Sequence, residues 1–287
     1  MALDRSRPHR YLESASRTSC MKNGRPRIGV FDSGVGGLTV LNRLVAKLPN
    51  ADYHYLGDTA RVPYGSRSSE TIIGYSRDGL NYLLGLEVDL LVIACNTSSA
   101  IALPRIGHEF SVPVLGVIED GAAAALDAAK HGVLVLGTRA TITSGIYQRL
   151  ITSSGTGLSV LGLACPLFVP IVEEGWAETP VAEAAIKMYM SSCMDYSYDL
   201  ILLGCTHFPI MQDTLQRIVG KHIRIEDPSI RVADRVASML PEAGRSSAPE
   251  IHFHVTDSPD SFVNVAKAMG VRVTNEVTHV DLTALNS

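Results

Sequence analysis

The sequence predicts an α/β protein with two pseudo-symmetric lobes, each a mainly parallel sheet flanked by helices. Short apolar runs alternate with helix-like patterns along the chain, as is typical of parallel α/β architecture. Segments 89–95 and 199–205 share one frame, 110 residues apart: an aspartate, five strand-like residues and a cysteine. Segment 132–141 resembles the start of the fold at Arg27, at an offset of about 105 residues. These two offsets suggest an internal duplication.

The first half of the chain predicts four strands with helices between them. A short apolar run that ends in small and polar residues is typical of a buried parallel strand, whose last side chains reach the edge of the sheet. The expected elements are the strand Arg27–Phe31, a glycine-rich turn, the helix Leu38–Leu48, the strand Tyr53–Leu56, the polar loop Gly57–Ser69, a helix over 70–86, a strand ending at Cys95, a helix over 97–109 and the strand Val112–Val117.

The second half repeats this pattern and adds a C-terminal segment. Because ligands of such sheets bind beyond the carboxyl ends of the strands, we expect the functional site in a cleft between the lobes. The expected elements are a strand, turn and helix start over 132–141, a strand ending at Cys205, a helix over 230–240, a linker rich in Pro, Gly and Ser over 241–249, the strand Glu250–Val255 and a helix over 259–269.

The composition is that of a globular protein, with 46% hydrophobic and 19% charged residues and a formal net charge of -4. This mild charge does not indicate nucleic-acid binding, and no stretch approaches the roughly 20 apolar residues of a membrane span. Residues 1–27 carry seven basic side chains against two acidic ones and lack the apolar centre of a signal peptide. We therefore expect residues 1–26 to form a basic, disordered extension.

The five cysteines are widely spaced and include no C-x-x-C pair, so they predict neither a disulfide framework nor a zinc ribbon. A reduced, cytoplasmic protein without a bound metal fits this pattern. Cys20, Cys165 and Cys193 have neither a counterpart in a repeated frame nor an expected helix N-terminus just after them, and they are expected to be structural or incidental.

The turn Asp32–Gly37 follows a strand and opens a helix. It lacks the third glycine of a dinucleotide-binding motif and the G-K-S/T of a phosphate-binding loop. One interpretation is a tight turn that permits close packing. The other is an anion cradle of free amides at the helix N-terminus, with a donor hydroxyl from Ser33 and a carboxylate from Asp32 for an ammonium group. A zwitterionic amino acid satisfies both ends of such a site.

The loop Gly57–Gly65 also has two interpretations. It is either an ordinary surface turn or a second carboxylate site, built from the Tyr64 hydroxyl and the Gly65 backbone N–H.

Cys95 and Cys205 are each followed by polar residues at an expected helix N-terminus, which favours the thiolate. A lone buried cysteine is usually an inert small hydrophobe, but a matched pair across a cleft is an acid/base pair suited to inverting a stereocentre. His207 is a further candidate to tune the thiol or shuttle protons. A metal site is the alternative, with thin support from one histidine and two distant thiols.

Four segments resemble signatures of the glutamate racemase family, and a fifth, Cys165–Glu173, is similar to another. They occur in family order and spacing over residues 27 to about 275, which makes the set highly specific. Two departures, the lack of a proline soon after Gly116 and Phe208 in place of a common tyrosine, lie away from the expected chemistry. The four segments are Phe31–Leu38, Gly57–Gly65, Ala94–Thr97 and Gly204–His207.

The resemblance implies a cofactor-independent racemase that interconverts L- and D-glutamate and supplies D-glutamate for peptidoglycan. One thiolate removes the α-proton while the other thiol delivers a proton to the opposite face. The implied acid/base thiols are Cys95 and Cys205, assisted in proton transfer by Asp32, Glu173 and His207. The implied substrate contacts are Asp32, Ser33, Tyr64, Gly65, Asn96, Thr97, Thr206 and His207.

The resemblance also implies the division into lobes and the partners. One lobe comprises residues 27–118 with 229–287, and the other comprises residues 119–228. Family members commonly form homodimers, and in some of them N-terminal residues help to bind a cell-wall precursor that activates the enzyme.

Three rival functions remain open at this point. An aspartate racemase would share both cysteines, so the Asp32–Ser33 and Pro63–Gly65 motifs carry the distinction. A non-catalytic amino-acid-binding protein explains the cleft but not the twin thiols. A thiol redox enzyme is disfavoured because the cysteines lie on separate lobes.

Overall fold

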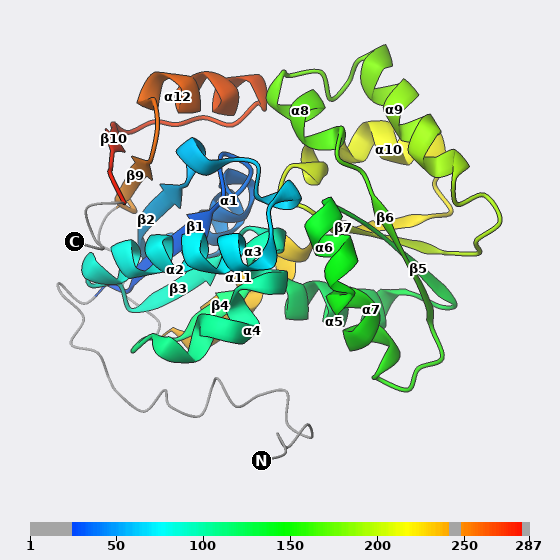
Figure 1. Ribbon diagram of the computed structural model, residues 1–287, viewed down its shortest axis with the longest axis horizontal. Helices are drawn as coiled ribbons and strands as arrows, with labels where there is room; N and C mark the ends of the chain where they lie inside the picture. The colour runs from blue at the N-terminus through cyan, green and yellow to red at the C-terminus, as the bar shows by residue number, and fades with distance from the viewer. Residues whose placement is uncertain (1–24, 241–247, 283–287) are drawn as a thin grey trace.

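The computed structural model describes residues 25–240 and 248–282. Their strands form two parallel sheets, which Figure 1 shows as two lobes. The first sheet has the order β10-β9-β2-β1-β3-β4 and contains β1 (Arg27–Asp32), β2 (Asp52–Gly57), β3 (Leu90–Ile93), β4 (Val114–Gly116), β9 (Ile251–Val255) and β10 (Val277–His279). The second has the order β6-β5-β7-β8 and contains β5 (Gly132–Gly137), β6 (Ser159–Ala164), β7 (Leu200–Gly204) and β8 (Arg224–Glu226).

The second sheet has the same strand order as four strands of the first. The series β2-β1-β3-β4 corresponds to β6-β5-β7-β8, and β9 and β10 extend the first sheet only. Phe31 pairs with Ile93 in the first sheet, and Gly137 pairs with Gly204 in the second. Cys95 and Cys205 therefore follow equivalent strands. The predicted α/β class with two pseudo-symmetric lobes is confirmed.

Helices connect the strands, and α11 packs against α1, α5 and β7, which joins the two lobes. One buried apolar cluster contains side chains from both sheets, among them Val30, Tyr55, Leu134 and Leu203. The helices are α1 (Leu38–Lys47), α2 (Ser69–Gly85), α3 (Asn96–Ile101), α4 (Leu103–Ile106), α5 (Ile118–Ala128), α6 (Arg139–Ser144), α7 (Ile146–Thr152), α8 (Phe168–Glu173), α9 (Pro180–Ser191), α10 (Gln212–Val219), α11 (Pro228–Met239) and α12 (Pro259–Ala268). Short 3-10 helices span Thr59–Arg61, Tyr64–Ser66, Gly107–Glu109 and Phe208–Met211.

Two predicted elements differ from the structure, and a proline explains each difference. The single helix predicted over 97–109 is divided into α3, α4 and a 3-10 turn, because Pro104 begins a new helix in its first turn and cannot continue the previous one. The strand predicted over 112–117 is only Val114–Gly116, because Pro113 has no N–H for the sheet.

The predicted extension and linker fall largely outside the described residues, which begin at Arg25 and omit 241–247. Arg25 itself is attached to the first sheet. Its guanidinium lies 3.4 Å from Asp52 Oδ1 and donates to the Ala248 carbonyl at 3.2 Å.

The aspartates that open the duplicated frames fix the start of each central strand. Asp89 Oδ2 accepts the Arg27 N–H at 2.8 Å. The Asp199 carboxylate accepts the backbone N–H groups of residues 130, 131 and 132 at 2.7, 3.1 and 3.0 Å. Burial alone would raise the pKa of Asp199, but these three donors hold it below its ordinary value.

We expect Asp199→Ala to lower the free energy of unfolding by about 2–4 kcal/mol at pH 7, because charged hydrogen bonds to three amides are lost. Since folding lowers the pKa of this carboxyl, its stabilisation is present above about pH 4 and is lost as the pH falls through the folded-state pKa. Urea unfolding at several pH values measures both effects. Asp195→Ala, at an exposed neighbouring position, is the matched control, and an equal loss in both variants contradicts the assignment.

Candidate active site

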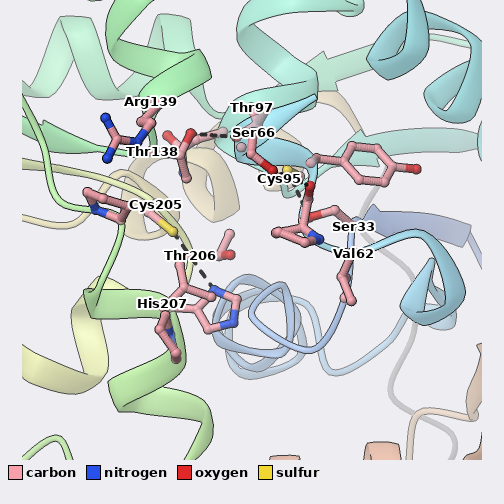
Figure 2. A pocket seen from close by; sticks show the side chains of 18 of the residues that line it. Ser33, Val62, Ser66, Cys95, Thr97, Thr138, Arg139, Cys205, Thr206 and His207 are labelled. Carbon is pink, nitrogen blue, oxygen red and sulfur yellow. Dashed lines mark hydrogen bonds between the residues drawn. The ribbon is translucent and has the colours of Figure 1, made fainter. Parts of the chain in front are cut away.

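A pocket of about 350 Å³ lies where the strand exits of the two sheets meet, and Figure 2 shows it from close by. Ten of the eleven residues singled out from the sequence line it; Asp32 does not. The lining residues are Ser33, Gly34, Val62, Pro63, Tyr64, Gly65, Ser66, Cys95, Asn96, Thr97, Thr138, Arg139, Pro166, Val169, Pro170, Glu173, Cys205, Thr206 and His207.

The two cysteines lie on opposite walls of this pocket (Figure 2). Cys95 stands between β3 and α3, and Cys205 directly follows β7. Both are free thiols and are almost completely buried, with 5% and 6% of their surfaces exposed. Their surroundings differ, although the strands that carry them are equivalent.

Cys95 lies beside the Ser33 hydroxyl and near the buried carboxyl of Asp32. Its Sγ lies 3.3 Å from Ser33 Oγ. Burial raises the pKa of Cys95 to about 11, the nearby Asp32 carboxyl contributes to this rise, and the Ser33 hydrogen bond opposes it. Cys95 is therefore a thiol at neutral pH. The Ser98 backbone N–H in the first turn of α3 also opposes this rise, as expected of a helix N-terminus, but desolvation outweighs it.

Cys205 lies beside a cationic histidine. The Cys205 Sγ is 3.8 Å from His207 Nδ1, and His207 Nε2 is 2.9 Å from Glu173 Oε1. Burial alone would lower the pKa of His207, but Cys205 and Glu173 on its two sides raise it to about 10. His207 therefore carries a proton at neutral pH, and an imidazolium at this place stabilises negative charge on the Cys205 sulfur.

Asp32 lies beneath the glycine-rich turn and outside the pocket lining, with only 1% of its surface exposed. Its Oδ2 accepts the Gly34 N–H at 2.9 Å, so that amide is not free for a ligand. Burial raises the pKa of Asp32. Its Oδ1 has no hydrogen-bond partner among the described residues, and the contact of this carboxyl with a substrate ammonium group stays a prediction. Asp32 also interacts electrostatically with Cys95 and His207.

At Gly36, the glycine-rich turn permits close packing, which is the first of its two predicted interpretations. A Cβ at Gly36 would lie 2.4 Å from both His207 Nδ1 and Thr206 Oγ1. The absence of a side chain lets the turn of one lobe lie directly against the strand exit of the other.

The Tyr64 hydroxyl is directed away from the predicted carboxylate site. It donates to Asp58 Oδ2, and Asp58 is fully buried. Asp58 also accepts Arg61 Nε at 2.7 Å and Thr256 Oγ1 at 2.8 Å. This carboxylate therefore anchors the loop that forms one pocket wall, while the ring of Tyr64 and the backbone at Gly65 contribute to the wall itself.

Polar groups from both lobes complete the pocket. Thr97 Oγ1 lies 2.9 Å from Thr138 Oγ1 and 3.2 Å from Thr141 Oγ1. Asn96 Oδ1 accepts the Tyr147 hydroxyl at 2.8 Å. Thr97, Thr138 and Asn96 line the pocket, and their hydroxyl and amide groups can hold carboxylate oxygens.

The sequence did not predict two pocket residues, Thr138 and Arg139. The resemblance of segment 132–141 to the first strand and turn was the available signal, because it makes Thr138 the counterpart of Ser33. Arg139 stands exposed at the rim, where its guanidinium makes no ion pair with another described residue.

In the part of the chain that the structure describes, no group of three or more His, Cys, Asp or Glu side chains is arranged to hold a metal ion. Across residues 25–240 and 248–282, no helix has both the length and the apolar character needed to cross a membrane.

A protein-family profile matches most of the chain. The profile for Asp/Glu/Hydantoin racemases matches residues 28–267. The chain belongs to this racemase family.

Individual relatives narrow the family to glutamate racemases. The glutamate racemase of Geobacter metallireducens is 41% identical over 244 residues, which cover 83% of this chain and 90% of the relative. That of Persephonella marina is 45% identical over 203 residues, covering 70% and 78%.

Solved structures agree with these relatives. Glutamate racemase from Francisella tularensis, crystallised with D-glutamate, has a TM-score of 0.83 and 34% identity and covers 92% of this chain and 100% of its own. The Escherichia coli enzyme, in complex with L-glutamate and the activator UDP-MurNAc-Ala, has a TM-score of 0.72 and 27% identity and covers 86% and 96%.

We expect Glu173→Gln to lower the pKa of His207 by more than about one unit from its value of about 10, because a neutral amide no longer stabilises the imidazolium. An NMR titration of the His207 ring measures this shift. Glu174→Gln, at the next and exposed position, is the matched control. An unchanged His207 titration in Glu173→Gln would show that the carboxylate does not hold the proton on the ring.

Proposed function

We propose that this protein interconverts L- and D-glutamate without a cofactor, by proton transfer between the α-carbon and two cysteines. The observation that carries the proposal is the placement of Cys95 and Cys205 on opposite walls of one pocket, at equivalent strand exits. A planar carbanion held between two such groups can be protonated on either face, which is the requirement for racemisation.

The unequal surroundings of the thiols support a division of labour. Cys205, beside the protonated His207, is proposed as the thiolate base, and Cys95, with a pKa of about 11, as the thiol acid. The base takes the α-proton, and the electron pair of the broken C–H bond spreads onto the α-carboxylate. Cys95 then gives its proton to the opposite face of the α-carbon. In the reverse direction Cys95 is the base and Cys205 the acid.

The substrate contacts are proposed from the polar lining. Ser33, Asn96, Thr97 and Thr206 present hydroxyl and amide groups, and the Gly65 backbone N–H adds a further donor. Donors aimed at the α-carboxylate stabilise the negative charge that develops there during proton removal. Glu173 and His207 are proposed to stabilise the thiolate form of Cys205. Asp32 is proposed to influence Cys95 electrostatically.

The lobe boundaries, the location, the oligomeric state and the activator of the enzyme are also proposals. The lobes are proposed to be residues 27–118 with 229–287 and residues 119–228, moving as units around the pocket. We also propose a cytoplasmic homodimer whose product serves peptidoglycan synthesis. A cell-wall precursor like the UDP-MurNAc-Ala bound by the Escherichia coli enzyme is the candidate activator.

We expect Cys95→Ser and Cys205→Ser each to lower kcat for glutamate racemisation by about 10²–10⁴-fold, which is the usual contribution of a general acid or base. Circular dichroism of L-glutamate solutions measures the rate. Cys193→Ser, which removes a buried free thiol outside this pocket, is the matched control. Near-normal turnover in both pocket variants contradicts the two-thiol assignment.

In D2O, without pyridoxal phosphate, we expect newly formed D-glutamate to carry deuterium at the α-carbon while the remaining L-glutamate stays unlabelled early in the reaction. Two separate bases predict this pattern, because the proton removed from one face is not the one delivered to the other. NMR of the separated enantiomers measures it. Equal early labelling of both enantiomers would instead indicate a single exchanging base.

A further inference from the structure

Tyr147 lies behind the pocket and contacts the neighbours of both cysteines. It belongs to α7, is 1% exposed, and donates its hydroxyl hydrogen to Asn96 Oδ1 at 2.8 Å. Asn96 directly follows Cys95. This hydrogen bond connects residues 51 positions apart, one beside β3 of the first sheet and one in a helix that packs on β6 of the second.

The Tyr147 ring is seated between two glycines. A Cβ at Gly204, the residue before Cys205, would lie 3.3 Å from Tyr147 Cε2, and a Cβ at Gly121 would lie 2.9 Å from the Tyr147 oxygen. The ring therefore packs directly against the backbone that carries Cys205, while its hydroxyl reaches the residue beside Cys95.

The Tyr147 hydroxyl keeps its proton and acts as a hydrogen-bond donor. Burial raises the pKa of Tyr147 well above its ordinary value, and the carboxyl groups of Glu119, Asp120 and Asp227 contribute to this rise. A buried hydroxyl that keeps its proton must donate it to an acceptor, and Asn96 Oδ1 is the acceptor in the structure. The Asn96 carboxamide is thereby fixed with its oxygen toward Tyr147.

The other end of the same carboxamide remains for the pocket. Asn96 lines the pocket, and its Nδ2 hydrogen-bonds to no other described residue. An NH2 group can donate to a carboxylate, whereas the flipped amide would present an oxygen that repels one. The orientation of this amide thus decides whether Asn96 attracts or repels an anionic substrate.

We propose that Tyr147 is a positioning residue for the racemase reaction, which orients the Asn96 amide as a carboxylate donor and holds the two cysteine-bearing strand exits in register. This inference rests on the proposed function, since the carboxylate is that of the amino-acid substrate. Tyr147 does not contact the substrate itself, because its hydroxyl hydrogen is already used by Asn96.

Tyr147→Phe tests the proposal, because it keeps the ring between the two glycines and removes only the hydroxyl. We expect KM for both L- and D-glutamate to rise about three- to tenfold, the effect of losing one oriented hydrogen bond, with a smaller change in kcat. In the Asn96→Ala background the Tyr147→Phe change is expected to add no further increase in KM, because the two residues act as one unit.

Tyr53→Phe is the matched control for stability. Tyr53 is also fully buried, and its hydroxyl contacts the Leu44 and Leu48 carbonyl oxygens at 2.9 and 2.8 Å, far from the pocket. We expect it to lose a similar amount of thermal stability with no change in KM. Equal KM values for Tyr147→Phe and Tyr53→Phe would overturn the proposal.

A second readout does not depend on turnover. NMR signals of the Asn96 side-chain NH2 are expected to shift in Tyr147→Phe and to remain in place in Tyr53→Phe. If wild-type protein fails to racemise glutamate but these amide signals respond, the proposed function fails while the Tyr147–Asn96 coupling stands. If the amide signals do not respond, the positioning role is overturned whatever the activity.

Discussion

The contact between Gly36 and the Thr206–His207 segment is the constraint on which the pocket depends. Any side chain at position 36 would collide with both residues at 2.4 Å, and Thr39 Oγ1 lies 3.0 Å from the Thr206 carbonyl oxygen next to it. The two strand exits can therefore approach until their polar ends line one pocket. Wider separation would admit water, weaken every charge interaction in the pocket and move the thiols apart.

This close approach gives equivalent strands unequal chemistry. Cys95 faces Ser33 above a buried carboxyl, whereas Cys205 faces an imidazolium that Glu173 supports from its other side. The duplicated backbone supplies two matching positions, and the neighbours at each position give its thiol a different environment. One thiol is held protonated, and the other is placed beside a positive charge.

The sequence predicted the strands that carry the site because buried parallel strands leave a clear pattern, an apolar run followed by small and polar residues. It also predicted that Cys95, Cys205 and the residues beside them would be neighbours. Its failures concern facts that only packing decides. Asp32 is buried outside the pocket lining, and the Tyr64 hydroxyl donates to Asp58, and neither arrangement could be predicted from the residue types alone. Several other elements were not predicted from the sequence at all, among them β6, β8, α5, α8, α9 and α10.

The different surroundings of the two thiols have a thermodynamic consequence. Water is achiral, so the mirror-image substrates have equal free energy and the equilibrium constant between them is one. The ratio kcat/KM must then be identical in both directions, however unequal the acid and the base. Any advantage that the imidazolium beside Cys205 gives to turnover in one direction must be matched by a proportional increase in KM for that same direction. A symmetric equilibrium thus permits an asymmetric site, and the asymmetry is visible only when the enzyme is saturated.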